Sequence, residues 1–381
     1  MKKILFIIPS LEIGGTLSSF VSLYNAMKDK CDIAVFAISH DGLTHLPFEQ
    51  DLLPKNNFVH AYRCNYSSCK GKNKFYVLFV KLLKKILTKL NIDDSFVYKH
   101  CISAFYSHYD VVVGFQEELP NKLVSMIQGA KKYAWIHCDY SRYFNCGNEF
   151  AIYKEFNKII CVSSYTSDVF KSFYPALANK TSFIYNILDT EQILKKSEID
   201  FHDPLYSNDS FTILSVGRIA EVKRFDCIPK IASQMKSCGA KFKWYIIGPN
   251  IGDLSYTNLM QEIDNCQVSD CVIYLGGKSN PYPYFKKSNL LVSLSKSEAC
   301  PMIFNEAKIL GVPAVSTNFP SAKEFIEDGY TGKICELSEM SDVLIHLIND
   351  KDCYKSLLNN VLQRKYSNSN IISELESLFE L

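Results

Sequence analysis

The sequence predicts an α/β protein of two domains, each built on a parallel sheet with helices on both faces. Short continuous apolar runs alternate with helical stretches, and this alternation starts again near residue 211. Strands that are buried on both faces read as continuous apolar runs, and strands joined through helices pair in parallel. A chain of 381 residues is also longer than one core of ordinary size accommodates.

The first half begins with the apolar run 4–8, followed by a glycine loop at Gly14 and Gly15 and a helix from about 17 to 28. Further strands are expected at 32–38, 110–115, 132–137 and 158–163. We expect residues 1–190 to form an N-terminal Rossmann-like domain.

The second half repeats this organisation. Strands are expected at 211–218, 243–248, 271–277, 289–295 and 313–317, with helices at 226–238 and 302–310. Residues 190–210 are polar and are expected to be a linker. The second Rossmann-like domain is therefore placed at 191–365, and a C-terminal helix at 366–381 is expected to pack back on the first domain.

Composition narrows the class of protein. The chain is 47% hydrophobic and 22% charged, which is typical of a folded protein, and its net charge of +2 argues against a nucleic-acid partner. Its 14 cysteines contain no Cys-x-x-Cys pair, and no apolar run reaches 18 residues. The apolar run at the N-terminus is too short for a signal peptide, so we expect a reduced, cytoplasmic protein.

Two glutamates lie on either side of an expected helix start. Glu298 precedes the helix that begins near Pro301 or Met302, and Glu306 lies one turn inside it. A helix N-terminus offers free N–H groups and a partial positive charge, which suit a phosphate. Two carboxylates flanking a diphosphate could each accept hydrogen bonds from hydroxyl groups, one on a sugar and one on a ribose. The alternative is a pair of surface glutamates at a helix start.

The first loop of the second half supports a diphosphate site. Arg218 follows the strand directly and Lys223 comes five residues later, so both could reach a diphosphate. Alone, two basic residues after a strand are more often a solvated edge.

Together these residues resemble the retaining GT-B glycosyltransferases of the family 4 type, which use nucleotide-sugar donors. The matching motifs run nearly from end to end: "GG" at 14–15, "WIH" at 135–137, "VS" at 162–163, "YNILD" at 185–189, "VGR" with Lys223 at 217–223, "IIG" at 246–248, "LGG" at 275–277, the E-x7-E pair at 298 and 306, and "GYTGKI" at 329–334. The resemblance implies two Rossmann-like domains facing each other across a cleft, the first on the acceptor side and the second binding the nucleotide sugar.

The resemblance also implies roles for individual residues. Arg218 and Lys223 would hold the donor diphosphate, Glu298 the transferred sugar and Glu306 the ribose. A histidine at position 137 would lie near the sugar and the acceptor, although a histidine at a strand end is otherwise more often structural. Further donor or acceptor contacts are expected from backbone at Gly15, Gly217, Pro301, Met302 and Ile303.

We therefore expect a hexosyl- or N-acetylhexosaminyltransferase of surface polysaccharide biosynthesis. Its donor is expected to be a UDP-sugar, its acceptor a glycan or lipid-linked saccharide, and its stereochemistry retaining. No metal or cofactor is expected, because Arg218, Lys223 and the helix amides at 301–303 supply the positive charge that the leaving group needs. Two alternatives remain: a nucleotide-sugar epimerase of the same shape, and a non-catalytic sugar-binding partner subunit.

Residues 70–90 contain seven lysines, no acidic residue, and apolar residues at helical spacing. A basic amphipathic helix can bind an anionic membrane surface, here the inner face of the plasma membrane. An ordinary packing helix with a solvated lysine face explains the pattern equally well.

Overall fold

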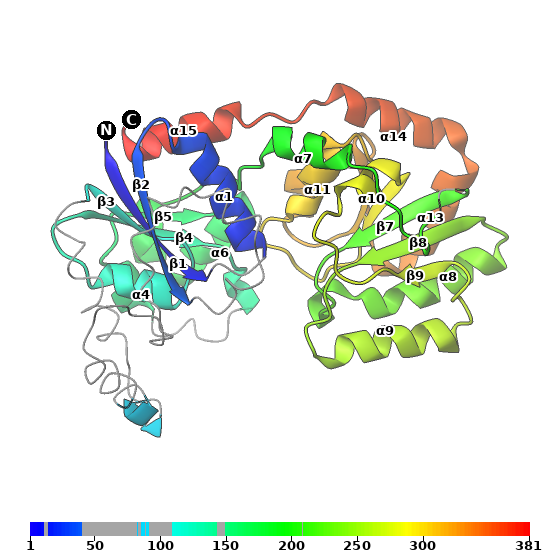
Figure 1. Cartoon of the computed structure of the whole chain (residues 1–381), viewed down its shortest axis with the longest axis horizontal. Helices are drawn as coiled ribbons and strands as arrows, with labels where there is room; N and C mark the ends of the chain where they lie inside the picture. The colour runs from blue at the N-terminus through cyan, green and yellow to red at the C-terminus, as the bar shows by residue number, and fades with distance from the viewer. Residues whose placement is uncertain are drawn as a thin grey trace. The chain divides into compact units, whose positions relative to one another are not determined.

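The computed structural model describes residues 1–10, 14–39, 82, 85–87, 89–90, 109–142, 149–207 and 209–381. The chain divides into two compact units, one formed by Met1–Ile187 with Asn368–Leu381 and the other by Leu188–Ser367 (Figure 1). We call these unit 1 and unit 2. The expected boundaries were 190/191 and 365/366, against 187/188 and 367/368 in the structure.

Unit 1 contains a parallel six-stranded sheet in the order β2-β1-β3-β4-β5-β6. The strands are β1 (Lys3–Ser10), β2 (Asp32–Ser39), β3 (Val111–Gly114), β4 (Lys131–Ile136), β5 (Lys158–Cys161) and β6 (Thr181–Phe183). In the described part of this unit the α-helices are α1 (Gly15–Met27), α4 (Leu119–Ser125), α5 (Phe150–Tyr153), α6 (Ser164–Phe173) and α15 (Ser369–Phe379). A core cluster of this unit combines apolar strand residues with side chains of α4, α5 and α6 and of the segments that flank these helices.

The last helix of the chain, α15, belongs to unit 1. The ring of Phe379 stacks on Tyr133 with 5.9 Å between centroids and meets Phe6 edge-on. Glu380 pairs with Lys2 and Lys131 around this contact. The ring contacts and the surrounding ion pairs hold α15 against β1 and β4.

Unit 2 also contains a parallel six-stranded sheet, in the order β12-β11-β10-β7-β8-β9. The strands are β7 (Phe211–Val216), β8 (Phe242–Ile247), β9 (Val272–Tyr274), β10 (Leu290–Ser293), β11 (Ala314–Thr317) and β12 (Gly332–Cys335). Its helices are α7 (Thr190–Ser197), α8 (Ile228–Ser237), α9 (Leu254–Asn265), α10 (Tyr282–Lys287), α11 (Met302–Ile309), α12 (Ala322–Phe325), α13 (Met340–Asn349) and α14 (Lys351–Gln363). Two such sheets with flanking helices confirm the predicted fold class.

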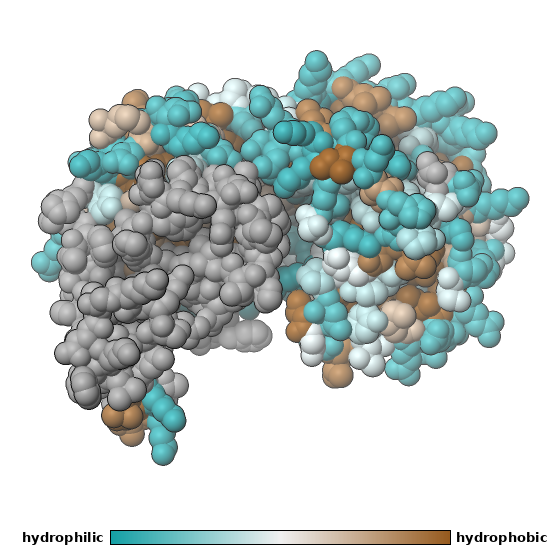
Figure 2. Space-filling view, viewed as in Figure 1, coloured by the Kyte–Doolittle hydropathy of each residue, from teal (hydrophilic) through white to brown (hydrophobic). Residues whose placement is uncertain are grey.

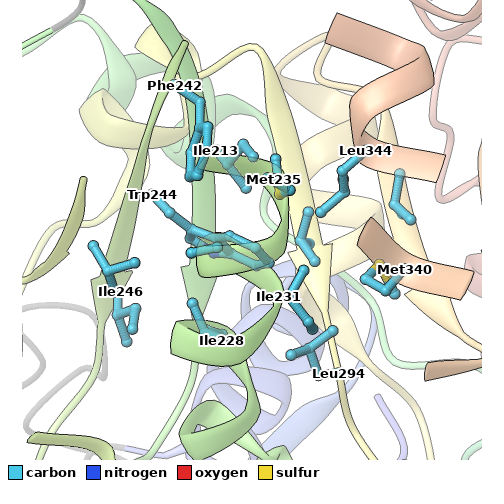
Figure 3. Close-up of a cluster of buried hydrophobic side chains, with 14 of the residues drawn as sticks. Ile213, Ile228, Ile231, Met235, Phe242, Trp244, Ile246, Leu294, Met340 and Leu344 are labelled. Atoms are coloured by element: carbon cyan, nitrogen blue, oxygen red, sulfur yellow. The ribbon is translucent and has the colours of Figure 1, made fainter. Parts of the chain in front are cut away.

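Trp244 lies at the centre of the unit 2 core, fully buried among side chains from β7, α8 and α13 (Figure 3). Its indole N–H donates to Ser215 Oγ at 3.0 Å, and Ser215 Oγ donates to the carbonyl of Val292 at 2.7 Å. These buried polar groups are thus paired, and the pairing ties β8, β7 and β10 together at mid-sheet. Figure 2 shows that the surface of unit 2 on the visible face is mostly hydrophilic, with apolar residues in small groups.

The expected linker at 190–210 is wrong in its first part, because residues 190–197 form α7 within unit 2. Asp189 caps this helix by accepting from the N–H of Gln192 at 3.0 Å, and Ile193 is buried. The polar composition that indicated a linker belongs to an amphipathic helix.

The expected helix at 70–90 lies mostly outside the described residues. Within the described part, Leu82, Ile86 and Leu90 are 59%, 46% and 61% exposed, whereas Leu87 is buried. No helix in the described parts of the chain has both the length and the apolar character needed to cross a bilayer.

Candidate functional site

The strand order of unit 2 places a topological switch point between β7 and β10. Ligands of doubly wound sheets bind at the carboxyl ends of the strands at such a point. Here β7 is followed by Gly217, Arg218 and Lys223, and β10 by Glu298 and the start of α11. The sheet therefore brings the predicted basic residues and the predicted glutamates to one edge, although they are far apart in the sequence.

The loop after β7 depends on two glycines. Gly217 has φ +154°, a conformation that residues with a side chain rarely adopt. At Gly248 an added Cβ would lie 1.7 Å from the carbonyl oxygen of Gly217, so the loops after β7 and β8 approach too closely for any side chain. This approach directs the chain into the turn that presents Arg218 and Lys223. Arg218 is exposed and makes no ion pair within the described chain.

Lys223 forms an ion pair with Glu298 through Oε1. The two side chains retain only 19% and 16% exposure, so the pair is largely removed from water. The sequence assigned both residues to a substrate but did not predict that they contact each other.

Ser295 orients the same carboxylate. Its hydroxyl donates to Glu298 Oε1 at 2.7 Å, and its own carbonyl accepts from the Thr317 hydroxyl at 2.7 Å. Ser321 Oγ donates to the main-chain carbonyl of Glu298, also at 2.7 Å. Both side-chain contacts fall on Oε1, and Oε2 receives no hydrogen bond from the described residues. Glu298 is therefore fixed with one oxygen available.

The helix that follows begins as predicted, with Pro301 as N-cap and Met302 as first residue. It ends before Gly311, whose φ of +72° suits the expected C-terminal position. No side chain in the described chain caps its N-terminus. Pro301 has no N–H, so the donors there are the amides of Met302 and Ile303, which corrects the expectation that Pro301 contributes one.

Glu306 faces Tyr282 on α10, whose hydroxyl donates to Oε1 at 3.2 Å. Burial raises the pKa of Glu306 to about 7, and the Tyr282 hydrogen bond only partly opposes this shift. A carboxyl of this kind is poorly solvated in the free protein and gains from hydroxyl donors supplied by a ligand.

In unit 1, His137 directly follows β4. Burial lowers its pKa to about 3, so the imidazole is neutral at physiological pH. Its Nε2 is buried and has no hydrogen-bond partner among the described residues. The main-chain N–H of His137 donates to Glu117 Oε2 at 2.9 Å.

Gly15 is the first residue of α1, preceded by Gly14 in an extended conformation. An added Cβ at either glycine would meet no described atom within 4 Å. The described neighbours therefore do not require glycine here, and residues 11–13, which precede the pair, lie outside the described residues.

One Asp-x-Asp triplet, Asp350–Lys351–Asp352, occurs in the chain and bears on the expectation that no metal is needed. Asp350 caps α14 by accepting from the N–H groups of Asp352 and Cys353. This carboxylate therefore has a structural role. In the described parts of the chain, no group of three or more His, Cys, Asp or Glu side chains is arranged to hold a metal ion.

Comparison with known proteins identifies the class of fold. The HepE protein of Anabaena, solved in complex with UDP-glucose, superposes with a TM-score of 0.75 over 100% of both chains at 17% sequence identity. The chain therefore has the GT-B fold. Residues 196–364, nearly all of unit 2, match the family described as "Glycosyl transferases group 1". The protein thus has a GT-B fold whose unit 2 is similar to the group 1 glycosyltransferases.

Curated proteins similar in sequence include two with a described activity or pathway. The N-acetyl-alpha-D-glucosaminyl L-malate synthase of Bacillus anthracis is 24% identical over 241 residues, which cover 58% of this chain and 62% of the relative. The capsular polysaccharide biosynthesis glycosyltransferase CapM of Staphylococcus aureus is 28% identical over 192 residues, 48% of this chain and 49% of CapM. The matched region thus spans about half to two thirds of these relatives.

Proposed function

We propose that the protein transfers a hexosyl or N-acetylhexosaminyl group from a UDP-sugar to a glycan or lipid-linked saccharide, with retention, in surface polysaccharide biosynthesis. The observation that carries the proposal is the convergence of Arg218, Lys223, Glu298 and the α11 N-terminus at the switch point of unit 2. The description of CapM as a capsular enzyme and of HepE as a UDP-glucose complex supports the choice of pathway and donor.

The reaction develops negative charge on the leaving diphosphate. The bond between the sugar and the diphosphate breaks, the acceptor oxygen bonds to the sugar on the same face, and the acceptor proton passes to the leaving phosphate. Arg218, Lys223 and the amides of Met302 and Ile303 would stabilise that diphosphate. Positive charge from these groups makes a divalent ion unnecessary for the step.

The remaining residues would hold the substrate. Glu298 Oε2 would accept from a hydroxyl of the transferred sugar, and Glu306 would accept from the ribose. The free Nε2 of neutral His137 suits a hydrogen bond to a sugar hydroxyl rather than a charge contact with the diphosphate. No described side chain is needed as a covalent nucleophile in this scheme.

Lys223 must change partner when the donor binds. In the free protein its ammonium group lies against Glu298, whereas in the proposed complex it contacts the diphosphate. A pair of this kind keeps both charges compensated until a more highly charged partner arrives.

Incubation with a panel of nucleotide sugars, with and without acceptor, tests the proposal. A transferase releases UDP and does so faster with acceptor, whereas an epimerase converts the donor sugar without acceptor and without releasing UDP. A non-catalytic subunit changes neither.

We also propose that residues 70–90 bind an anionic membrane surface and hold the protein at the cytoplasmic face of the membrane. In the described part of this segment, the exposed Leu82, Ile86 and Leu90 recur at helical spacing and Lys85 and Lys89 are exposed. A lipid-linked acceptor would lie at the same surface.

A further inference from the structure

The short loop between β3 and α4 combines an unusual backbone conformation at Glu118 with a buried carboxylate at Glu117. It contains only residues 115–118, and Glu118 adopts φ 63° and ψ −125°. A positive φ is uncommon for a residue with a side chain, and such conformations concentrate at functional sites. The loop follows β3, next to β1 at the switch point of the unit 1 sheet.

Glu117 in this loop is a buried carboxylate, 7% exposed. A charged group in such a place is unfavourable unless hydrogen bonds compensate it. Burial raises the pKa of Glu117, and hydrogen bonds from the His137 main chain and the Cys138 thiol oppose the shift. An apolar side chain would avoid this penalty, so the carboxylate calls for an explanation other than stability.

Two of the contacts between this loop and the end of β4 involve His137, beside the hydrogen bond of Glu117 with the Cys138 thiol and the packing of the Phe115 ring on Trp135. Glu117 Oε2 accepts from the His137 N–H at 2.9 Å, and the Phe115 ring meets the His137 ring edge-on with centroids 4.8 Å apart. One contact fixes the main chain and the other fixes the ring. The ring nitrogen Nε2 is buried and has no hydrogen-bond partner in the described chain.

We propose that Glu117 is a positioning residue for His137, holding the end of β4 so that Nε2 meets a substrate hydroxyl. The inference rests on the proposed function, in which His137 contacts a substrate sugar. Because Glu117 binds the main chain and not the imidazole, it acts by placing the ring and not by changing the ring's charge.

Glu117→Leu removes the acceptor but fills much of the same space, and Glu117→Gln keeps an acceptor oxygen without the charge. We expect Glu117→Leu to lower kcat by about 10–100-fold, the scale of a misplacement of about 1 Å, with little change in donor KM. Glu117→Gln should lose no more than about 3-fold. Glu149→Leu is the matched control, because it removes a partly buried carboxylate of unit 1 that contacts Tyr140 instead.

A double-mutant cycle separates positioning from general structural damage. If Glu117 acts through His137, Glu117→Leu should cause no further loss in a His137→Ala background. Multiplying losses, or wild-type kcat in Glu117→Leu, would overturn the proposal. Full activity of His137→Ala would overturn it together with the proposed role of His137.

A measurement that does not depend on turnover separates the positioning proposal from the proposed function. Amide hydrogen exchange at His137 should accelerate in Glu117→Leu and stay slow in Glu117→Gln and Glu149→Leu. If exchange follows this pattern but no sugar is transferred, the proposed function fails while the positioning contact stands. If exchange at His137 is unchanged in Glu117→Leu, the positioning proposal fails by itself.

Discussion

Replacing Glu306 with glutamine should stabilise the free protein and weaken its hold on UDP. Burial raises the pKa of Glu306 to about 7 from an ordinary value of 4.5. The folded state therefore binds the proton more tightly than the unfolded state between these two values. The free energy of unfolding falls as pH rises through this interval, and the loss is complete above about pH 7.

The loss of unfolding free energy can be calculated from the same pKa interval. At about 1.4 kcal/mol per pKa unit, the difference between 4.5 and about 7 sets an upper limit of about 3.5 kcal/mol. Because Glu306 retains some solvent exposure, we expect about 1–2 kcal/mol, or several degrees in Tm at about 2–4 °C per kcal/mol. Glutamine has no charge to desolvate and keeps an oxygen that can accept from Tyr282.

The assay is thermal unfolding of wild type and Glu306→Gln from pH 5 to pH 8, without nucleotide. The variant should match the wild type near pH 5 and exceed it at pH 8. In calorimetric titration it should bind UDP about 10-fold more weakly, since one hydroxyl acceptor is replaced by a donor. Glu191→Gln, exposed on α7, is the control and should change neither quantity. Equal Tm curves for wild type and Glu306→Gln would refute the desolvation argument, and unchanged UDP affinity would refute the ribose contact.

The remaining predictions concern the diphosphate, the sugar, metal dependence and the membrane. Arg218→Ala and Lys223→Ala should each lower turnover by about 10²–10³-fold, and unchanged UDP affinity in both would remove the 217–223 loop from the phosphate site. Glu298→Ala should slow transfer while UDP still binds, and wild-type transfer rates in this variant would contradict its sugar contact. Transfer should survive EDTA, and activity that is lost in chelator and returns with Mg²⁺ or Mn²⁺ would contradict a metal-free step. The product should keep the donor's anomeric configuration, and an inverted anomeric signal by proton NMR would contradict retention. Changing three or four lysines of 70–90 to glutamine should weaken binding to anionic vesicles, and the binding of the wild-type protein should weaken as salt rises. Binding that does not depend on salt, or an equal loss when lysines of unit 2 are changed instead, would favour a packing helix.

The fold could be predicted largely because parallel strands buried on both faces are written as continuous apolar runs. The two strands that the sequence did not indicate, β6 and β12, lack this signal. β6 has three residues, two of them exposed, and β12 is a four-residue strand that begins with Gly332. Both lie at sheet edges, where burial on two faces is not required.

The sequence predicted that the residues of the candidate site lie at strand ends and at a helix start, but it did not predict their contacts. Periodicity and helix-start signals located Glu298 and Glu306, and the strand end located Arg218 and Lys223. The ion pair between Lys223 and Glu298 joins residues 75 positions apart, and only the sheet order brings them together.

Two further contacts had weak signals or none. Ser295 lies three residues before Glu298, a spacing that could have indicated a side-chain contact. Glu117 gave no signal, because a glutamate in a loop is ordinarily solvated and its burial follows from tertiary structure.

The most direct test of the proposed diphosphate site compares nucleotide-sugar binding and turnover by the wild-type protein and by Lys223→Ala. A panel of UDP-hexoses and UDP-N-acetylhexosamines is added without acceptor, and Tm and released UDP are both measured. We expect at least one donor to raise the wild-type Tm, with a stabilisation of about 2.7 kcal/mol at 100 times Kd, and to be slowly hydrolysed to UDP. Lys223→Ala should show a smaller shift and less UDP. A panel in which no UDP-sugar raises Tm or yields UDP, or in which Lys223→Ala matches the wild type, would contradict the claim that this site handles the diphosphate of a nucleotide sugar.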